Sequence, residues 1–327
     1  MCDIDRLGSA SWLVSQVRAG IGAILSNKYL GGPGTSDPES KTLKNVLEFW
    51  GKQITAGTSP DCNPELPFRA YSTMALYIAA GAVARMDRSV VKLIPAIHAA
   101  IASPHENGEL MSRSLEILVG EIPFLNAENH AVVKPLFKQW IYSQAIQPLY
   151  EKALPPAKGL EASRYTVAIL AAVKHCPFAV YDADLTELIR LLVTTVSKRT
   201  AATTPSAPGV AATEALSLPQ ATAALRILLD ILAADSAALL PHLHTLINGA
   251  AELHVAAAST QRRDPHAATC RRLALQFLGA LPGKFEERHL LAYAPQTQRM
   301  LAAASGDPAR EVRRVALLAR ESWSKVA

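Results

Sequence analysis

Apolar residues recur along most of the chain with the spacing of helices that bury one side. After Asp307 they stand three, four and seven residues apart, at Val312, Val315, Ala316, Ala319 and Trp323. This spacing places one apolar stripe along one face of an α-helix. No stretch alternates apolar and polar residues over the length of a strand, and β-branched residues stand inside helical patterns. The pattern therefore predicts an all-α fold.

The predicted helices come in pairs, because a two-part signal recurs near the end of the chain. A first helix carries a proline, at Leu239-Leu240-Pro241 and again at Ala294-Pro295. A second helix then opens at an Asp-Pro step, where Asp supplies an N-cap oxygen and Pro suits the first helical position. The two steps, Asp264-Pro265 and Asp307-Pro308, lie 43 residues apart. HEAT repeats have a period of about 40 to 47 residues, so we expect an α-solenoid of HEAT-type helix pairs.

Weaker copies of the signal extend the array toward the N-terminus. They occur at Ile94-Pro95 and at Leu218-Pro219, and a capping box at Ser36 and Glu39 precedes a further helical pattern. We expect a single array over residues 1–327, with about seven helix pairs. Clusters of Gly, Pro, Ser and Thr predict loops near residues 31–37, 57–67, 200–218 and 256–263.

Composition agrees with a helical protein that stays out of the membrane. Half of the residues are apolar and only 6 % are aromatic, which is typical of packed helices rich in Ala, Leu and Val. The longest apolar run, Met74 to Ala84, is too short to cross a bilayer. The N-terminus lacks the pattern of a secretory signal peptide. The cysteines have no metal-ligand spacing and indicate isolated thiols in a reducing compartment. They are Cys2, Cys62, Cys176 and Cys270.

The sequence contains no recognisable catalytic, cofactor or metal pattern. A Gly-x-Ser-x-Gly elbow, a His-Glu-x-x-His pair and a Gly-rich phosphate loop are all absent. Gly31-Gly32-Pro33-Gly34 lacks the Lys-Ser/Thr ending of a phosphate loop and is interpreted as a hinge. His242 and His244 are two residues apart on a helix and point to different sides. We expect a protein that is not an enzyme and carries no cofactor or metal, although distant helices could still assemble a site.

Positive charge concentrates near the C-terminus and favours an acidic partner. From Ala258 to the end there are twelve Lys and Arg against six Asp and Glu. Arg272 and Arg313 are expected to pair with acidic residues inside the array, because a guanidinium suits bidentate internal pairs. Aromatic side chains near residue 140 either anchor a partner or belong to the core. The predicted partner-binding residues are Arg310, Arg314, Arg320, Arg271, Arg288, Trp140 and Tyr142.

Two segments resemble the MMS-nineteen family. The closing segment, Asp307-Pro-Ala-Arg-Glu-Val-Arg-Arg-Val-Ala-Leu-Leu-Ala-Arg-Glu-Ser-Trp323, is similar to the last HEAT helix of that family. The second segment, His130-Ala-Val-Val-Lys-Pro-Leu-Phe-Lys-Gln-Trp-Ile-Tyr142 with Gln147-Pro-Leu-Tyr150, is similar to a helix pair of the same family. Generic HEAT patterning does not require this His or the Phe-Lys-Gln triplet. The resemblance covers Phe68 to the end of the chain.

The resemblance implies a non-catalytic adaptor of the cytosolic iron–sulfur protein assembly targeting complex. Such an adaptor docks on a WD40-propeller subunit and a small cysteine-bearing subunit, so that clusters reach client proteins such as DNA helicases and polymerases. It implies a cytoplasmic and nuclear protein, of which this chain is a C-terminal fragment, with no membrane contact and no direct nucleic-acid contact.

The basic C-terminal region leaves one alternative. A HEAT-repeat scaffold could use this surface to bind nucleic acid or to act in nuclear transport. Nucleic-acid binding would depend steeply on salt, because each neutralised phosphate releases counterions. The sequence argues against it, since acidic residues are interspersed and stacking aromatics are missing.

Overall fold

The structure, a computed structural model, describes most of the chain beyond residue 67. The described residues are 45, 48–49, 51–52, 54–55, 68–84, 86, 88–103, 106–120, 135–154, 160–203, 217–259 and 265–326. Every element in these ranges is helical and none is a strand, which confirms the all-α fold. The expected loops at 31–37 and 57–67 and the capping box at Ser36 lie outside the described residues, and the number of helix pairs stays a prediction.

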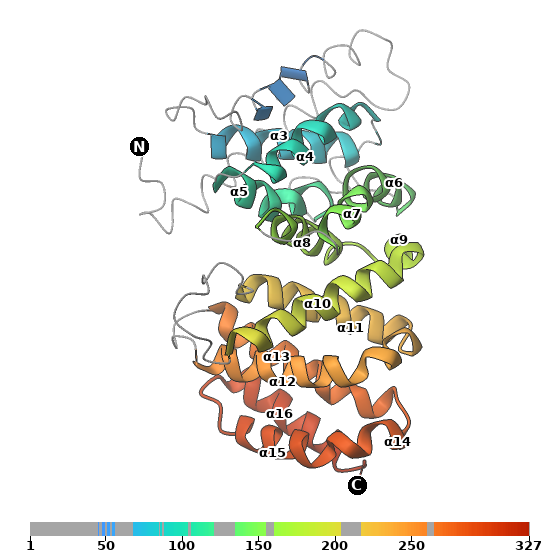
Figure 1. The fold of residues 1–327 in the computed structure, drawn as a ribbon, viewed down its shortest axis with the longest axis vertical. Coiled ribbons are helices and arrows are strands. Elements are labelled where there is room, and N and C mark those ends of the chain that lie inside the picture. The colour runs from blue at the N-terminus through green and yellow to red at the C-terminus, as the bar shows by residue number, and fades with distance from the viewer. Residues whose placement is uncertain are drawn as a thin grey trace. The chain divides into compact units, whose positions relative to one another are not determined.

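The chain forms two compact units, of which the first ends at Ala183 and the second begins at Asp184. Within each unit, successive helices stack in pairs, which is the architecture of an α-solenoid (Figure 1). No helix among the described residues has both the length and the apolar character needed to span a bilayer.

In the first unit, seven α-helices have described bounds, and short 3₁₀ and π segments join several of them. In this unit α5 packs against α4 and α8, and α7 packs against α8. The α-helices are α3 (Phe68–Ala84), α4 (Ile94–Ala102), α5 (Glu106–Ser114), α6 (Pro135–Ile141), α7 (Tyr150–Ala153), α8 (Leu160–Val173) and α9 (Phe178–Tyr181). The other segments are η2 (Arg88–Leu93), η3 (Leu115–Leu118), η5 (Tyr142–Ile146) and η6 (Gln147–Leu149).

The second unit has two layers. One layer holds the first helix of each pair, and in it α10 packs against α12; in the other layer α13 packs against both α11 and α16. The α-helices are α10 (Leu185–Thr203), α11 (Leu218–Ala234), α12 (Leu243–Ser259), α13 (Pro265–Ala280), α14 (Glu287–Leu290), α15 (Ala294–Ala304) and α16 (Arg310–Trp323). The 3₁₀ segments are η9 (Ala237–His242), η10 (Leu281–Gly283) and η11 (Leu291–Tyr293), while η7 (Asp182–Asp184) crosses the boundary between the units.

Prolines shape the start of the first helices, as the repeat signal predicts. Pro95 and Pro295 occupy the first turns of α4 and α15, and Pro241 lies in the 3₁₀ segment that leads into α12. A proline has no N–H to donate, so it fits where the helical ladder has not yet begun. Each first helix therefore enters through a tighter 3₁₀ turn.

The predicted loop boundaries are partly correct. α11 begins at Leu218, and the backbone N–H of Ser217 donates to Oε1 of Gln220 at 2.9 Å, which is half of a capping box. The preceding helix continues to Thr203, so the expected loop at 200–218 is helical at its start. α12 likewise continues to Ser259, inside the loop expected at 256–263.

Candidate partner-binding surfaces

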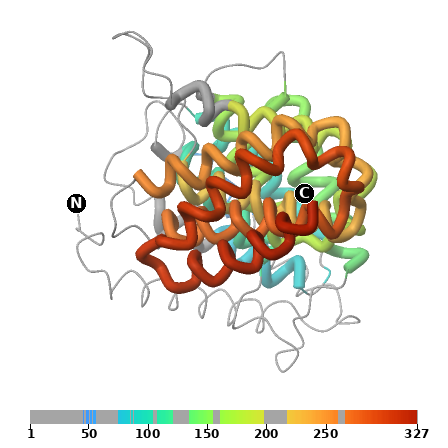
Figure 2. The backbone as a smooth tube through the Cα atoms, turned by 90° about the horizontal axis from the view of Figure 1, so that it is seen from below, coloured from blue at the N-terminus to red at the C-terminus, as the bar shows by residue number. Residues whose placement is uncertain are grey.

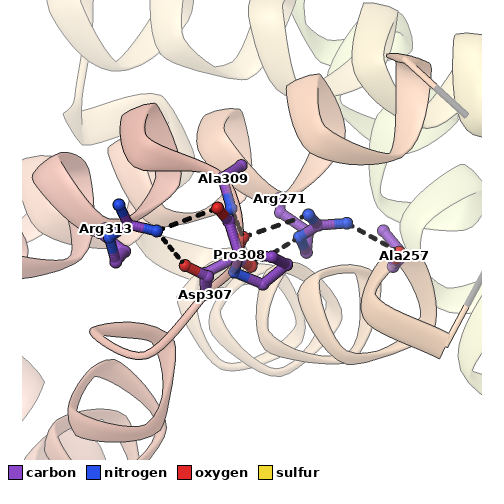
Figure 3. A network of polar contacts seen from close by, with 6 residues as sticks. All are labelled: Ala257, Arg271, Asp307, Pro308, Ala309 and Arg313. Carbon is purple, nitrogen blue, oxygen red and sulfur yellow. Dashed lines mark hydrogen bonds and ion pairs between the residues drawn. The ribbon is translucent and has the colours of Figure 1, made fainter. Parts of the chain in front are cut away.

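A buried ion pair joins the last two helix pairs. Arg271 on α13 and Asp307 in the turn before α16 have side chains that are 9 % and 6 % exposed. Arg271 donates through Nε to Oδ2 of Asp307 at 2.8 Å and through Nη2 to Oδ1 at 3.2 Å (Figure 3). Its Nη1 donates to the carbonyl oxygen of Ala257 on α12 at 3.1 Å. Arg271 thus connects three elements, and the expectation that it contacts a partner is wrong.

The Asp-Pro step at 307 forms a turn instead of starting the helix as expected. α16 begins at Arg310, and the N–H of Ala309 donates to Oδ1 of Asp307 at 2.8 Å. This contact is an Asx turn, in which a side-chain oxygen replaces a backbone acceptor. α13, in contrast, begins directly at Pro265. Because a helical residue turns by about 100°, the delayed start rotates α16, and Arg314 is exposed although it lies 43 residues after the buried Arg271.

The two arginines that were expected to pair internally do make internal contacts. Arg313 donates through Nη1 to the carbonyl oxygens of Asp307 at 2.7 Å and Pro308 at 2.9 Å, which closes the turn from the other side (Figure 3). Arg272 donates to Oε1 of Gln276 at 3.0 Å, and its Nε lies 3.8 Å from Oε2 of Glu311. Arg313 therefore binds backbone carbonyls instead of the predicted carboxylate.

The outer face of α16 is basic and apolar. The helix buries four of the five residues of the predicted stripe, Val312, Ala316, Ala319 and Trp323, while Val315 is only partly buried. Arg310, Arg314 and Arg320 are exposed. Leu317 and Leu318, which the sequence analysis did not single out, are 57 % and 56 % exposed. Figure 2 shows this last helix, in red, together with α15 on the side of the second unit nearest the viewer.

The remaining predicted contacts lie elsewhere. Arg288 on α14 is exposed, and its Nε lies 2.8 Å from Oε2 of Glu286, so its charge is already paired. Trp140 on α6 is partly exposed, and its ring centroid lies 4.6 Å from that of Phe137. Tyr142 is 1 % exposed and donates its hydroxyl to that of Tyr150 at 3.2 Å. Tyr142 is a core residue, which corrects its assignment to a partner surface.

A groove that the sequence analysis missed lies between α12 and α15. Its volume is about 370 Å³. Ile247, Ala251 and Val255 line it from α12, and Tyr293, Thr297 and Met300 line it from the α15 side. Glu252 is the one ionisable carboxylate of the lining, and burial raises its pKa above the ordinary value for Glu. The residues stand three, four or eight apart, but the same spacing also fits ordinary core contacts, so no signal in the sequence marks an open groove.

The chain matches one known family model, described as "RNAPII transcription regulator C-terminal" (MMS19_C), over residues 19–282. The match covers most of the chain. The chain belongs to the MMS19 C-terminal family. A comparison with curated proteins found no match.

The family match includes one of the two segments that resemble the MMS19 family. The segment His130–Tyr150 lies inside the matched residues, and Asp307–Trp323 lies beyond them. The stack of helix pairs makes this MMS19 family chain a helical scaffold.

The described residues of this MMS19 family chain form no metal-binding site. No three His, Cys, Asp or Glu side chains gather there as a metal site. Cys176 and Cys270 are buried, and burial raises the pKa of the Cys176 thiol to about 11. A buried thiol with a raised pKa is a poor nucleophile and a poor ligand, because both roles need the thiolate. The other two cysteines, Cys2 and Cys62, lie outside the described residues.

Proposed function

We propose that this chain is a non-catalytic adaptor of the cytosolic iron–sulfur protein assembly targeting complex. In this role it docks the complex so that clusters reach apo-proteins of DNA replication, repair and transcription, in the cytoplasm and the nucleus. The observation that carries the proposal is membership in the MMS19 family. Stacked helix pairs support it, because a solenoid offers an extended surface for partners.

The docking surface of this proposal is the outer face of α16. Arg310, Arg314 and Arg320 supply donors there, and Leu317 and Leu318 supply apolar area. Arginine is enriched at the energetic centres of protein interfaces, where a planar guanidinium can bind carboxylates bidentately. The proposed partners are the WD40-propeller subunit and the small cysteine-bearing subunit, with acidic or carbonyl groups facing these arginines.

Co-purification tests the proposal and the surface separately. The full chain is co-expressed with the propeller and the small subunit, as wild type and with Arg310, Arg314 and Arg320 all changed to Glu. A control with two reversals changes the exposed Arg190 and Arg226 of the same unit to Glu. We expect stable co-elution of the wild type and of the control, and loss of co-elution for the α16 variant.

Two other outcomes are informative. Co-elution that survives the α16 reversal would move the interface away from this helix while keeping the adaptor role. No co-elution of the wild type with either subunit would contradict the adaptor role itself.

The exposed arginines also favour the second candidate function, a scaffold that binds nucleic acid. If it holds, a filter-binding titration should retain DNA or RNA at low salt and lose it steeply as salt rises. Absence of retention at low salt would dispose of it.

A further inference from the structure

The groove between α12 and α15 interrupts an otherwise regular packing of helices. In the second unit α10 packs directly on α12, and α13 packs on α11 and on α16. The pair α12 and α15 occupies the equivalent place one repeat later, but these two helices come close at very few points. The space between them is the groove of about 370 Å³.

The shape of the groove follows the two helix axes. On the α12 side its lining runs from Ile247 to Val255, and on the α15 side it runs from Tyr293 to Met300. Eight residues of helix rise by about 12 Å, so the groove is about two helical turns long. An elongated apolar groove of this length suits the side chains that a docked helix presents at positions i, i+3, i+4 and i+7.

One end of the groove is fixed by polar contacts. Nδ1 of His244 lies 3.1 Å from the hydroxyl of Tyr293, and the two rings lie 5.7 Å apart. Nδ2 of Asn248 lies 3.2 Å from Nε2 of the same histidine. These contacts link α12 to the segment before α15 at one end of the groove.

The groove carries one acidic side chain and no basic one among its lining residues. Glu252 lies in the lining, and burial is the sole influence that raises its pKa; no cation offsets it. None of the ion pairs found among the described residues involves this carboxylate. Glu252 is an exposed residue among the mostly apolar residues that line the groove, so its unpaired charge faces a cation that approaches from solvent.

We propose that the groove between α12 and α15 binds a short helical segment of a partner protein whose apolar face carries one Lys or Arg, and that this cation pairs with Glu252. The apolar side chains of the segment fill the space between Ile247, Val255 and Met300. The proposal is independent of the docking surface on α16 and of the identity of the targeting complex.

A selection experiment identifies the occupant. A phage-displayed library, in which the outer positions of a stable helix are randomised, is panned on the full chain. A variant with Ala251→Trp serves for counter-selection, because an indole at this lining position fills the groove; circular dichroism and thermal melting check that it folds. We expect the enriched helices to share two or three large apolar residues at i, i+3 or i+4, together with one Lys or Arg.

Point variants then test the ion pair with one enriched peptide. Glu252→Gln should weaken binding about tenfold, since it removes a charge-assisted hydrogen bond and leaves the ligand cation unpaired. Glu252→Lys should abolish binding. The matched control is Glu287→Gln, which removes an exposed carboxylate from α14 outside the groove and should leave the affinity unchanged.

Several results would overturn the proposal. They are an enrichment of acidic helices, binding that survives Ala251→Trp, and a library that yields no helix dependent on the groove. Sedimentation of the wild type adds one more: a dimer dispersed by Ala251→Trp would show that a second copy of the chain occupies the groove. The adaptor proposal is tested by co-elution of α16 variants with the targeting subunits, and the groove proposal is tested by helix binding to groove variants. Failure of one proposal therefore leaves the other testable.

Discussion

Breaking the ion pair between Arg271 and Asp307 should loosen the last helix pair specifically. Two substitutions probe it. Arg271→Met keeps the length of the side chain and removes every donor. Asp307→Asn removes the charge but keeps an oxygen to accept the N–H of Ala309, so the Asx turn survives. Each change leaves one member of a buried pair without its counter-charge.

The size of the effect follows from the burial of both side chains. They are 9 % and 6 % exposed, and two hydrogen bonds of 2.8 and 3.2 Å join them. Removing one partner of such a pair costs about 3–5 kcal/mol, because the remaining charge is buried without compensation. We expect about 3 kcal/mol for each single variant. The double variant should cost clearly less than the sum, with a coupling energy of about 2 kcal/mol or more.

Native-state hydrogen exchange measures this loss where it occurs. Global unfolding of a repeat array need not be two-state, whereas the exchange of amides in α16 reports on the opening of the last pair. A loss of 3 kcal/mol corresponds to an acceleration of about a hundredfold. The exposed pair of Arg113 and Glu109 serves as control, and Arg113→Met should cost no more than about 0.5 kcal/mol. Single variants that each cost under 1 kcal/mol, or that add without coupling, would refute the reasoning.

Three further variants test other parts of the second unit. A Cβ at Gly249 would lie 1.9 Å from Cγ1 of Val196, so Gly249→Ala should cost about 1–3 kcal/mol in urea unfolding, and adding Val196→Ala should recover part of it. Trp323→Phe removes the indole N–H that donates to the carbonyl of Leu278 at 2.8 Å. It should cost about 1–3 kcal/mol in thermal melting, because a buried acceptor loses its partner. Burial lowers the pKa of His254 below its ordinary value near 6.5. The unfolded chain therefore binds the proton more readily, so the stability this group contributes is complete above pH 6.5 and falls below it, by at most about 1.4 kcal/mol per pH unit. Melting curves between pH 7.5 and 5.5 should show a smaller decline in His254→Leu, and an equal decline in both chains would contradict this assignment.

The sequence predicts the helices well because their signals are local. The apolar stripe of α16 and the proline at the start of α15 depend on residues a few positions apart, and both predictions agree with the structure. The carbonyl of Leu278 illustrates a signal that becomes clear only in the fold. In an α-helix it would accept from the N–H of residue 282, but that residue is Pro282, so the indole of Trp323 takes its place.

The burial of individual arginines could not be predicted, because it depends on where each helix starts. Arg271 and Arg314 are both among the predicted partner-binding residues, but only Arg314 is exposed. The Asx turn at Asp307 delays the start of α16, and this rotates Arg314 into solvent while the carboxylate turns back to Arg271. A shift of the helix start by two residues rotates each later side chain by about 200°, which places it on the opposite side of the helix.

The groove could not be predicted from the sequence for a related reason. It arises because the second helices, α13 and α16, pack more closely than the first helices, α12 and α15. In the layer of second helices, a Cβ at Gly279 would lie only 2.8 Å from Cβ of Ala319, so small residues bring α13 and α16 very close. The ion pair between Arg271 and Asp307 stabilises one end of this contact. The hydrogen bond from the indole N–H of Trp323 to the carbonyl of Leu278 stabilises the other. Between α12 and the α15 side, the polar contacts of His244 lie at one end of the groove. The second helix, α16, already holds the last pair against α13. The proposed partner helix can therefore fill the groove without displacing a core contact of this chain. The apolar area that the partner buries then favours binding, and no free energy of folding is lost.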